Sequence, residues 1–185
     1  RFRNVTGVQT CALPILIYTQ WQITDKLPEG GDLFYGLDFG YVHPLVLVKV
    51  CHYEGANYVK LLIYKSGLTP SEIIREVKDY ISDRKPVYCD AAEPKSIEEL
   101  YRGGINAQPA NKEVWAGILK IKSYPLFITS DSKELIRELQ SYKWKKDKND
   151  NVIDEPVKEN DDACDAMRYA IFTHLHKPAF QVSVW

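Results

Sequence analysis

Three runs rich in β-branched and aromatic residues follow one another in the first half of the chain. They cover residues 33–39, 44–51 and 58–64, and turn segments at Gly40-Tyr41 and Gly55-Ala56-Asn57 separate them. Runs of this length and composition, bounded by glycine, are typical of strands. Because the connections are short, we expect the three strands to form an antiparallel meander.

Beyond the third run, apolar residues recur with the spacing of helices. Thr69 is expected to cap a helix that begins at Pro70 and ends near Asp83, because Glu72 can complete a capping box. The same reasoning predicts two helices at 94–101 and 114–122, a third that begins after Ser130 as its N-cap, and a last one at 161–174 with Asn160 as its N-cap. Short strands are predicted at 86–90, 105–109 and 126–128. This order predicts an α/β fold with a mixed central sheet and helices on its faces.

The remaining segments suggest an appendage and boundaries. Residues 142–145 and 152–153 flank a charged turn at 147–150 and predict a small β-hairpin. We expect residues 16–32 to be a lead-in segment, residues 33–176 the domain, and residues 177–185 a C-terminal tail.

Residues 1–15 need separate treatment. The string from Val5 to Ile15 resembles a translated sequencing-library adapter, so residues 1–15 are expected to be an artefact, and the chain a C-terminal fragment of a longer protein. The apolar stretch Ala12–Tyr18 is interrupted by Pro14 and is far shorter than the roughly 20 residues of a membrane span.

Composition narrows the class of protein. The chain has 185 residues, 45% hydrophobic and 26% charged, which is typical of a globular domain. With 24 Lys+Arg against 25 Asp+Glu there is no bulk positive field, so a nucleic-acid partner needs a local basic patch. The four cysteines form no C-x-x-C pair, which argues against a zinc site or disulfide framework and favours a reducing cytosol.

Three aspartates occupy positions that solubility does not explain. Asp38 lies in an apolar strand between Gly36 and Gly40, which we expect to leave room for something bulky to approach. Asp90 follows a buried strand, where ligands gather in such sheets. Asp165 shares a helical stripe with aromatic residues, so it is expected to point inward and to need a counter-charge.

Each carboxylate also has an ordinary explanation. Asp38 could accept backbone hydrogen bonds at a turn, and the helix dipole favours Asp161 and Asp162 in a first turn. Three carboxylates at one place in low dielectric repel one another, however, and hard divalent cations relieve that repulsion. We therefore predict Mg²⁺ or Mn²⁺, as a pair of ions about 4 Å apart of the kind that cleaves phosphodiesters.

A local basic run supplies a candidate DNA contact. Lys143, Lys145 and Lys146 lie on the predicted hairpin and could bind phosphates, with Lys112 adding to that face. The alternative is an edge strand that lysines protect from aggregation. The chain contains no Walker A loop.

The motifs at residues 36–41, 88–94 and 161–169 resemble the nuclease domain of tailed-phage terminase large subunits. The resemblance spans about residues 20–176, and Trp21–Asp25, Asn111-Lys112 and Glu138–Trp144 add to it. It implies an RNase H-like fold and a two-metal endonuclease that cuts concatemeric viral double-stranded DNA during genome packaging. It also implies catalytic and metal-ligand roles for Asp38, Asp90 and Asp165.

Two departures accompany this resemblance. The family often has an aspartate where this chain has His43, and a histidine where it has Asp162. We expect Asp162 to be an additional metal ligand or a neighbour of one, and Lys112 to stabilise charge near the scissile phosphate. The resemblance further implies an ATPase motor domain, a portal and a small terminase subunit as partners of the full-length protein, in the host bacterial cytoplasm and without a membrane.

Two other functions stay open at this point. Residues Gly36–Gly40 also resemble the first phosphate motif of actin-like ATPases, but that fold needs a second glycine-rich loop and a longer chain. The non-enzymatic alternative is a DNA-binding or assembly module whose carboxylates only support the fold.

Overall fold

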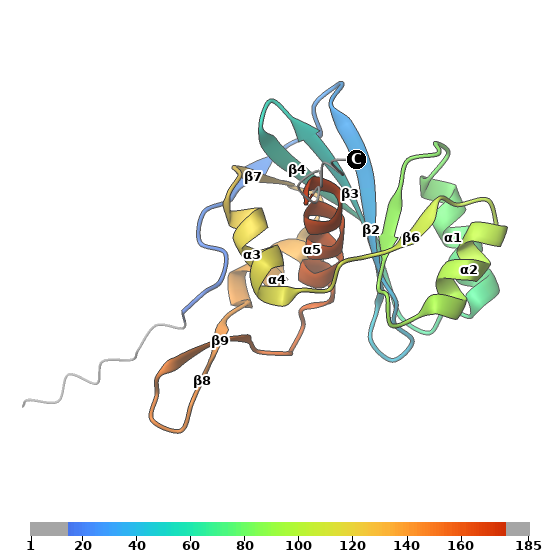
Figure 1. The fold of residues 1–185 in the computed structure, drawn as a ribbon. Helices are drawn as coiled ribbons and strands as arrows, with labels where there is room; N and C mark the ends of the chain where they lie inside the picture. Colours follow the sequence, from blue (N-terminus) through green and yellow to red (C-terminus); the bar gives the residue numbers. More distant parts are fainter. Residues whose placement is uncertain (1–14, 177–185) are drawn as a thin grey trace, which may run out of the picture.

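The computed structural model describes residues 15–176, and its centre is a seven-stranded mixed sheet (Figure 1). The strands lie in the order β1-β7-β4-β3-β2-β5-β6. Within this sheet β3 alone runs antiparallel to both of its neighbours; the other pairings are parallel. Their bounds are β1 Gln22–Thr24, β2 Asp32–Asp38, β3 Leu45–Tyr53, β4 Ala56–Lys65, β5 Val87–Cys89, β6 Ala107–Pro109 and β7 Leu126–Thr129.

Helices cover the two faces of the sheet. On one face lie α1 (Pro70–Tyr80) and α2 (Pro94–Arg102), and on the other α3 (Val114–Lys122), α4 (Lys133–Ser141) and α5 (Asp162–Leu175) (Figure 1). Successive side chains of a strand point to opposite faces, so each strand feeds two cores. Leu47 of β3 packs in the core with α1 and α2, whereas Val46 and Val48 pack in the core with α5.

The main expectations about local structure are confirmed. Strands β2, β3 and β4 form the antiparallel meander. Glu72 accepts a hydrogen bond from the backbone N–H of Thr69 (2.9 Å), as the capping box predicts, and a further one from the Thr69 hydroxyl (2.7 Å). The hairpin consists of β8 (Trp144–Lys146) and β9 (Val152–Pro156), and it projects from the body in Figure 1. The mixed sheet with helices on its faces is also as predicted.

Three helix ends were predicted wrongly. The N-cap position of α4 is Ser132 rather than Ser130, and that of α5 is Asp161 rather than Asn160. Asn160 instead takes a left-handed conformation (φ 49°) and turns the chain into the helix. Helix α1 ends at Tyr80 instead of near Asp83, because the next residue, Ile81, turns extended and is buried in the core.

The lead-in segment is part of the fold. Its strand β1 pairs in parallel with β7, a pairing that the sequence pattern did not reveal. Ile17 and Tyr18 are buried, and Leu16 bridges to Lys143. Except for Ile15, the adapter-like segment lies outside the described residues, as does the C-terminal tail. No helix within residues 15–176 is long and apolar enough to cross a lipid bilayer.

Candidate functional site

Asp38 and Asp90 lie at the carboxyl ends of two adjacent parallel strands. Leu37 of β2 is paired with Cys89 of β5, and both side chains belong to the core beneath α1 and α2. The next residue on each strand is one of the aspartates, and the backbone N–H of Asp90 donates to the carbonyl oxygen of Leu37 (3.1 Å). Because faces alternate along a strand, Asp38 and Asp90 turn toward the opposite face, where α5 lies.

Helix α5 reaches these strand ends because Gly36 has no side chain. A Cβ at position 36 would lie 2.0 Å from the carbonyl oxygen of Ala166, so any other residue would push the helix off the sheet. Gly40 closes a tight turn, since its Cβ would lie 2.4 Å from the carbonyl oxygen of His43. The expectation that these glycines leave space for a bulky ligand is therefore corrected: protein backbone fills both places.

Asp165 points inward, as predicted, and has two counter-charges. The residue is 7% exposed. Its Oδ1 lies 2.8 Å from Nη2 of Arg168, an ion pair without the alignment of a good hydrogen bond, and its Oδ2 lies 3.2 Å from Nζ of Lys158. The sequence pattern had identified neither cation, although Arg168 stands three residues after Asp165, a spacing that lets side chains meet on a helix.

Two more carboxylates lie at the start of α5. Asp161 Oδ2 is 3.3 Å from Nζ of Lys158, and Asp162 Oδ1 is 3.8 Å from Nδ1 of the exposed His43. Burial raises the pKa of both carboxyls. His43 and Asp162, the two positions that depart from the family pattern, are thus neighbours across the site.

The carboxylates repel one another most at Asp38. Burial, followed by the charges of Asp165, Asp90 and Asp162, raises the pKa of Asp38 to about 8, and Lys112 lowers it only in part. A carboxyl in that position keeps its proton near neutral pH unless a cation compensates the negative charge around it.

Lys112 is the cation that faces the strand ends. It follows β6, and its Nζ lies 2.5 Å from Asp90 Oδ1, so the structure places it beside a predicted site residue. The same Asp90 oxygen accepts a hydrogen bond from the backbone N–H of Ala92 (2.9 Å). One Asp90 oxygen is therefore held by protein groups.

Glu138 is a buried carboxylate that the site prediction did not include. It is 3% exposed, and its Oε2 accepts the backbone N–H groups of Ala163 (2.8 Å) and Cys164 (3.0 Å), while the Tyr64 hydroxyl donates to Oε1 (3.1 Å). Burial raises its pKa to about 7, although these three hydrogen bonds act in the opposite direction. Glu138 satisfies the N-terminal N–H groups of α5 and so fixes the turn that carries the three helix aspartates.

The donor chemistry fits a hard divalent cation. Oxygen ligands from Asp38, Asp90, Asp162 and Asp165 are the kind that Mg²⁺ and Mn²⁺ prefer, and the raised pKa of Asp38 marks a place where positive charge is needed. Lys112 meets part of that need at Asp38, while Lys158 and Arg168 compensate the charge of Asp165. Within residues 15–176, no three His, Cys, Asp or Glu side chains stand close enough together to form a ready-made metal cage.

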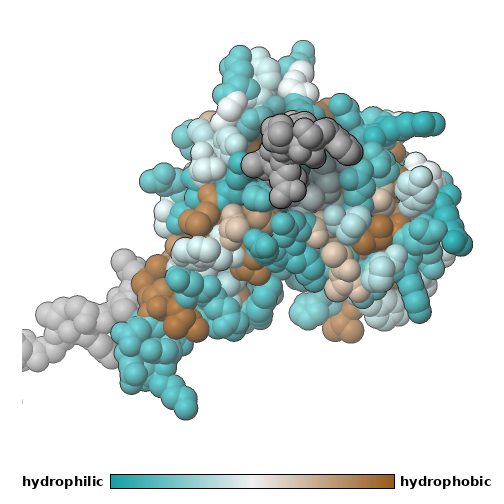
Figure 2. Space-filling view, viewed as in Figure 1, coloured by the Kyte–Doolittle hydropathy of each residue, from teal (hydrophilic) through white to brown (hydrophobic). Residues whose placement is uncertain are grey.

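The hairpin lysines lie on a separate projection. Lys145 pairs with Glu155 and Lys146 lies 3.6 Å from Asp150, so hairpin carboxylates partly compensate both. Figure 2 shows a hydrophilic hairpin tip beside a hydrophobic band. Val152 and Ile153 of β9 are exposed apolar residues of the hairpin. Lys143 is exposed at the base of the hairpin. Lys158 follows β9 and contacts Asp161 and Asp165, so the chain leads from the hairpin directly to these carboxylates.

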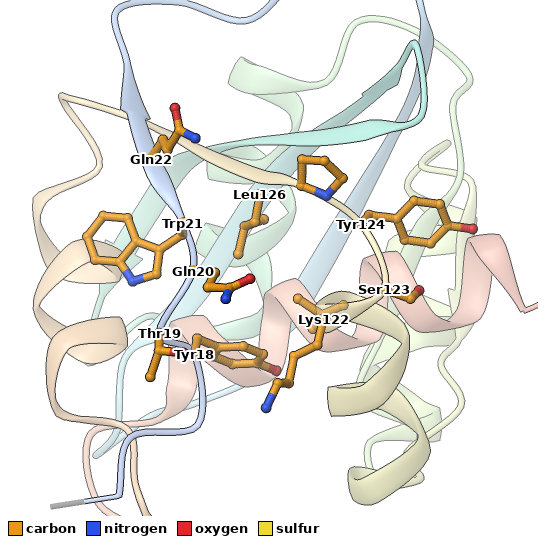
Figure 3. A pocket seen from close by; sticks show the side chains of 11 residues that line it. Tyr18, Thr19, Gln20, Trp21, Gln22, Lys122, Ser123, Tyr124 and Leu126 are labelled. Carbon is orange, nitrogen blue, oxygen red and sulfur yellow. The ribbon is translucent and has the colours of Figure 1, made fainter.

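A cavity of about 770 Å³ lies away from the carboxylates. The segments 18–22 and 121–126 form its walls, and Figure 3 shows Trp21 and Tyr18 on one side and Lys122 and Tyr124 on the other. No acidic or histidine side chain lines it. It is therefore not part of the carboxylate site.

Comparison with known proteins gives the family. A model of the terminase RNase H-like domain matches residues 45–172. The PBSX phage terminase large subunit of Bacillus subtilis (strain 168) is 26% identical over 143 residues, which are 74% of this chain and 33% of that protein. The chain thus spans about a third of the length of this curated relative.

Solved structures share the fold. The large terminase nuclease domain of bacteriophage SPP1, with bound Mn, is 21% identical (TM-score 0.74; 86% of this chain and 99% of that one). The large terminase of a thermophilic bacteriophage, in complex with ATP-γ-S, is 26% identical (TM-score 0.75; 86% and 44%). The nuclease of thermophilic phage G20c, with bound magnesium, is 17% identical (TM-score 0.65; 86% and 97%). Since the family match covers more than half of the sequence and the RNase H-like fold agrees with it, this chain belongs to the family of terminase RNase H-like nuclease domains.

Proposed function

We propose that the chain is a metal-dependent endonuclease that cleaves double-stranded viral DNA during genome packaging. The observation that carries this proposal is that Asp38 and Asp90 lie at adjacent strand ends and that the charges of Asp90 and of Asp165 in α5 both raise the pKa of Asp38. These residues are far apart in the sequence. Repulsion between their carboxylates destabilises the folded state unless a bound cation compensates it, so a function that needs the carboxylates explains their placement. Phosphodiester hydrolysis with bound metal ions is a use that requires such a group.

The proposed cofactor is a pair of Mg²⁺ or Mn²⁺ ions. Asp38, Asp90 and Asp165 would hold them, with Asp162 as a fourth ligand. When bound, such ions supply an activated water and stabilise the negative charge of the leaving oxygen. The Mn and magnesium bound in the SPP1 and G20c nuclease domains support this choice.

The chain's own cations have distinct proposed roles. Lys112, which pairs with Asp90, would contact the scissile phosphate and stabilise its charge. Lys143, Lys145 and Lys146 would bind the DNA backbone from the hairpin through sequence-independent phosphate contacts. Lys158, which contacts Asp161 and Asp165, would also be within reach of a bound DNA phosphate through its half-exposed ammonium.

The wider context is also a proposal. The relatives include a large terminase in complex with ATP-γ-S, of which this chain covers 44%. We therefore propose that the full-length protein couples this nuclease to an ATPase motor and acts with a portal and a small terminase subunit in the host bacterial cytoplasm.

A plasmid-nicking assay tests the reaction. Supercoiled plasmid should be nicked in Mn²⁺ and left intact in EDTA. Asp38→Asn and Asp90→Asn should each abolish nicking, because each removes the charge of a ligand, whereas Asp79→Asn, the same change at an exposed position of α1, should leave nicking unchanged. If the chain is only a DNA-binding or assembly module, it will bind DNA without nicking and show no Mn²⁺ binding in isothermal titration.

A further inference from the structure

Arg168 of α5 is the largest fully buried side chain in the described part of the protein. Only 2% of the residue is exposed. Transferring a guanidinium from water to the protein interior costs free energy unless its charge and its N–H groups find partners. The partners of Arg168 therefore indicate its role.

The guanidinium connects two parts of the proposed site. Nη2 lies 2.8 Å from Oδ1 of Asp165, and Nη1 donates a hydrogen bond to the carbonyl oxygen of Lys112 (3.2 Å). Lys112 in turn reaches Asp90 with its ammonium. Arg168 thus contacts both the carboxylate of Asp165 and the backbone of Lys112, the residue whose ammonium pairs with Asp90.

The surrounding structure makes room for this arginine at a cost to packing. Gly117 in α3 faces it, and a Cβ at that position would lie 2.7 Å from Cγ and 2.8 Å from Cδ of Arg168. Glycine weakens a helix interior, and Nε of Arg168 is buried without a hydrogen-bond partner among residues 15–176. An apolar residue of similar length at 168 would fill the space beside Gly117 without burying an unpaired N–H, which argues for a role other than helix packing.

The contact restricts how Asp165 can turn. A carboxylate is planar, so holding Oδ1 at Arg168 fixes the direction of Oδ2, the oxygen that faces Lys158. The centre of the Tyr169 ring lies 4.8 Å from the guanidinium carbon, and this contact limits the movement of the Arg168 side chain.

We infer that Arg168 is a positioning residue of the proposed metal site: it orients Asp165 toward the metal and fixes the Lys112 segment beside Asp90. This inference rests on the proposed function. Groups that orient metal ligands without touching the metal change metal affinity by about 10- to 100-fold when they are replaced.

Two substitutions and a matched control test the role. Arg168→Gln removes the charge, and Arg168→Lys keeps it on a compact ammonium that cannot contact Asp165 and the Lys112 carbonyl as a fork does. Arg102→Gln makes the same change at an exposed arginine of α2, whose Nε lies 2.8 Å from Glu98. For each variant, nicking is measured across a range of Mn²⁺ concentrations, Mn²⁺ binding by isothermal titration, and melting by circular dichroism.

We expect Arg168→Gln to raise the Mn²⁺ concentration for half-maximal nicking about 10- to 100-fold, Arg168→Lys to raise it less, and Arg102→Gln to leave it unchanged. A role in packing alone lowers the melting temperature but leaves the Mn²⁺ midpoint where it was, and that result would overturn the inference. If Arg168→Gln does not fold, an unchanged midpoint in Arg168→Lys overturns it equally. A wild-type chain that neither binds Mn²⁺ nor nicks DNA refutes the proposed function itself, whereas metal-dependent wild-type nicking with unchanged variant midpoints refutes only the role of Arg168.

Discussion

Gly36 of β2 lies directly against the carbonyl oxygen of Ala166 in α5, so closely that a Cβ on residue 36 would be 2.0 Å from it. This contact brings the helix aspartates over the strand that ends in Asp38. A second contact holds helix α5 in place: Glu138 of α4 accepts hydrogen bonds from the backbone N–H groups of Ala163 and Cys164 in the first turn of α5.

Gly36→Ala should therefore damage both the fold and the site. The added methyl group must displace α5, and we expect the free energy of unfolding to fall by about 3 kcal/mol or more. Chemical denaturation measures the change. Gly55→Ala, in a turn with open space around it but with φ at 74°, is the control and should cost only about 1 kcal/mol of backbone strain. Equal effects of the two substitutions would contradict the importance of this contact.

Glu138→Ala should destabilise the chain by about 2–4 kcal/mol, because it leaves the N–H groups of Ala163 and Cys164 buried without an acceptor. Glu134→Ala, on the more exposed side of the same helix, should change stability by no more than about 0.5 kcal/mol. Denaturant midpoints compare the two. Retained stability in Glu138→Ala would mean that the N-terminal groups of α5 find other acceptors.

The pKa of Asp38 predicts how stability depends on pH. Because its pKa is raised to about 8 in the folded chain, the folded state holds a proton that the unfolded state has lost between roughly pH 4 and 8. Without metal, stability should therefore fall as pH rises through this range, by at most about 1.4 kcal/mol per pH unit from this group. Glu138, with its pKa raised to about 7, acts in the same direction over the lower part of the range.

Asp38→Asn should flatten this pH dependence and stabilise the metal-free chain at pH 7. Mn²⁺ binding should show the opposite trend with pH in the wild type, because below about pH 8 the ion must displace the proton of Asp38. The rise in melting temperature on adding Mn²⁺ should thus be larger at pH 8 than at pH 6. An equal rise at both values would show that Asp38 is already ionised without metal.

Replacing Lys145 and Lys146 together by alanine should weaken DNA binding similarly for all sequences. Removing one phosphate contact lowers the slope of log affinity against log salt by about 0.9. Because both lysines have acidic partners on the hairpin, the combined change in slope is expected to be smaller than the removal of two full contacts would give. Binding measured at several salt concentrations tests this, with Lys78→Ala on α1 as a distant control; an unchanged slope would place the DNA elsewhere.

Local patterns in the sequence were sufficient to predict most elements. The meander, the capping box at Thr69, the helix at 114–122 and the hairpin all depend on residues close to one another in the chain, and the structure has each of them. The sequence also singled out Asp38, Asp90 and Asp165, because a lone aspartate in an apolar run or on an inward helical stripe conflicts with its own surroundings.

The partners of those aspartates depended on contacts between distant segments. From the sequence, Gly36 suggests space for a ligand, but in the structure α5 occupies that space. Glu138 looks like an ordinary helix glutamate in the sequence, and only the fold brings it to the first turn of α5. Strand β1 is three residues long and is defined by its pairing with β7, about a hundred residues later. The spacing of residues along the sequence determined which aspartates are unusual. The packing of α5 on the sheet decided which groups surround them, because the pairing and the pKa of a buried carboxylate depend on the groups that the fold brings within a few ångströms of it.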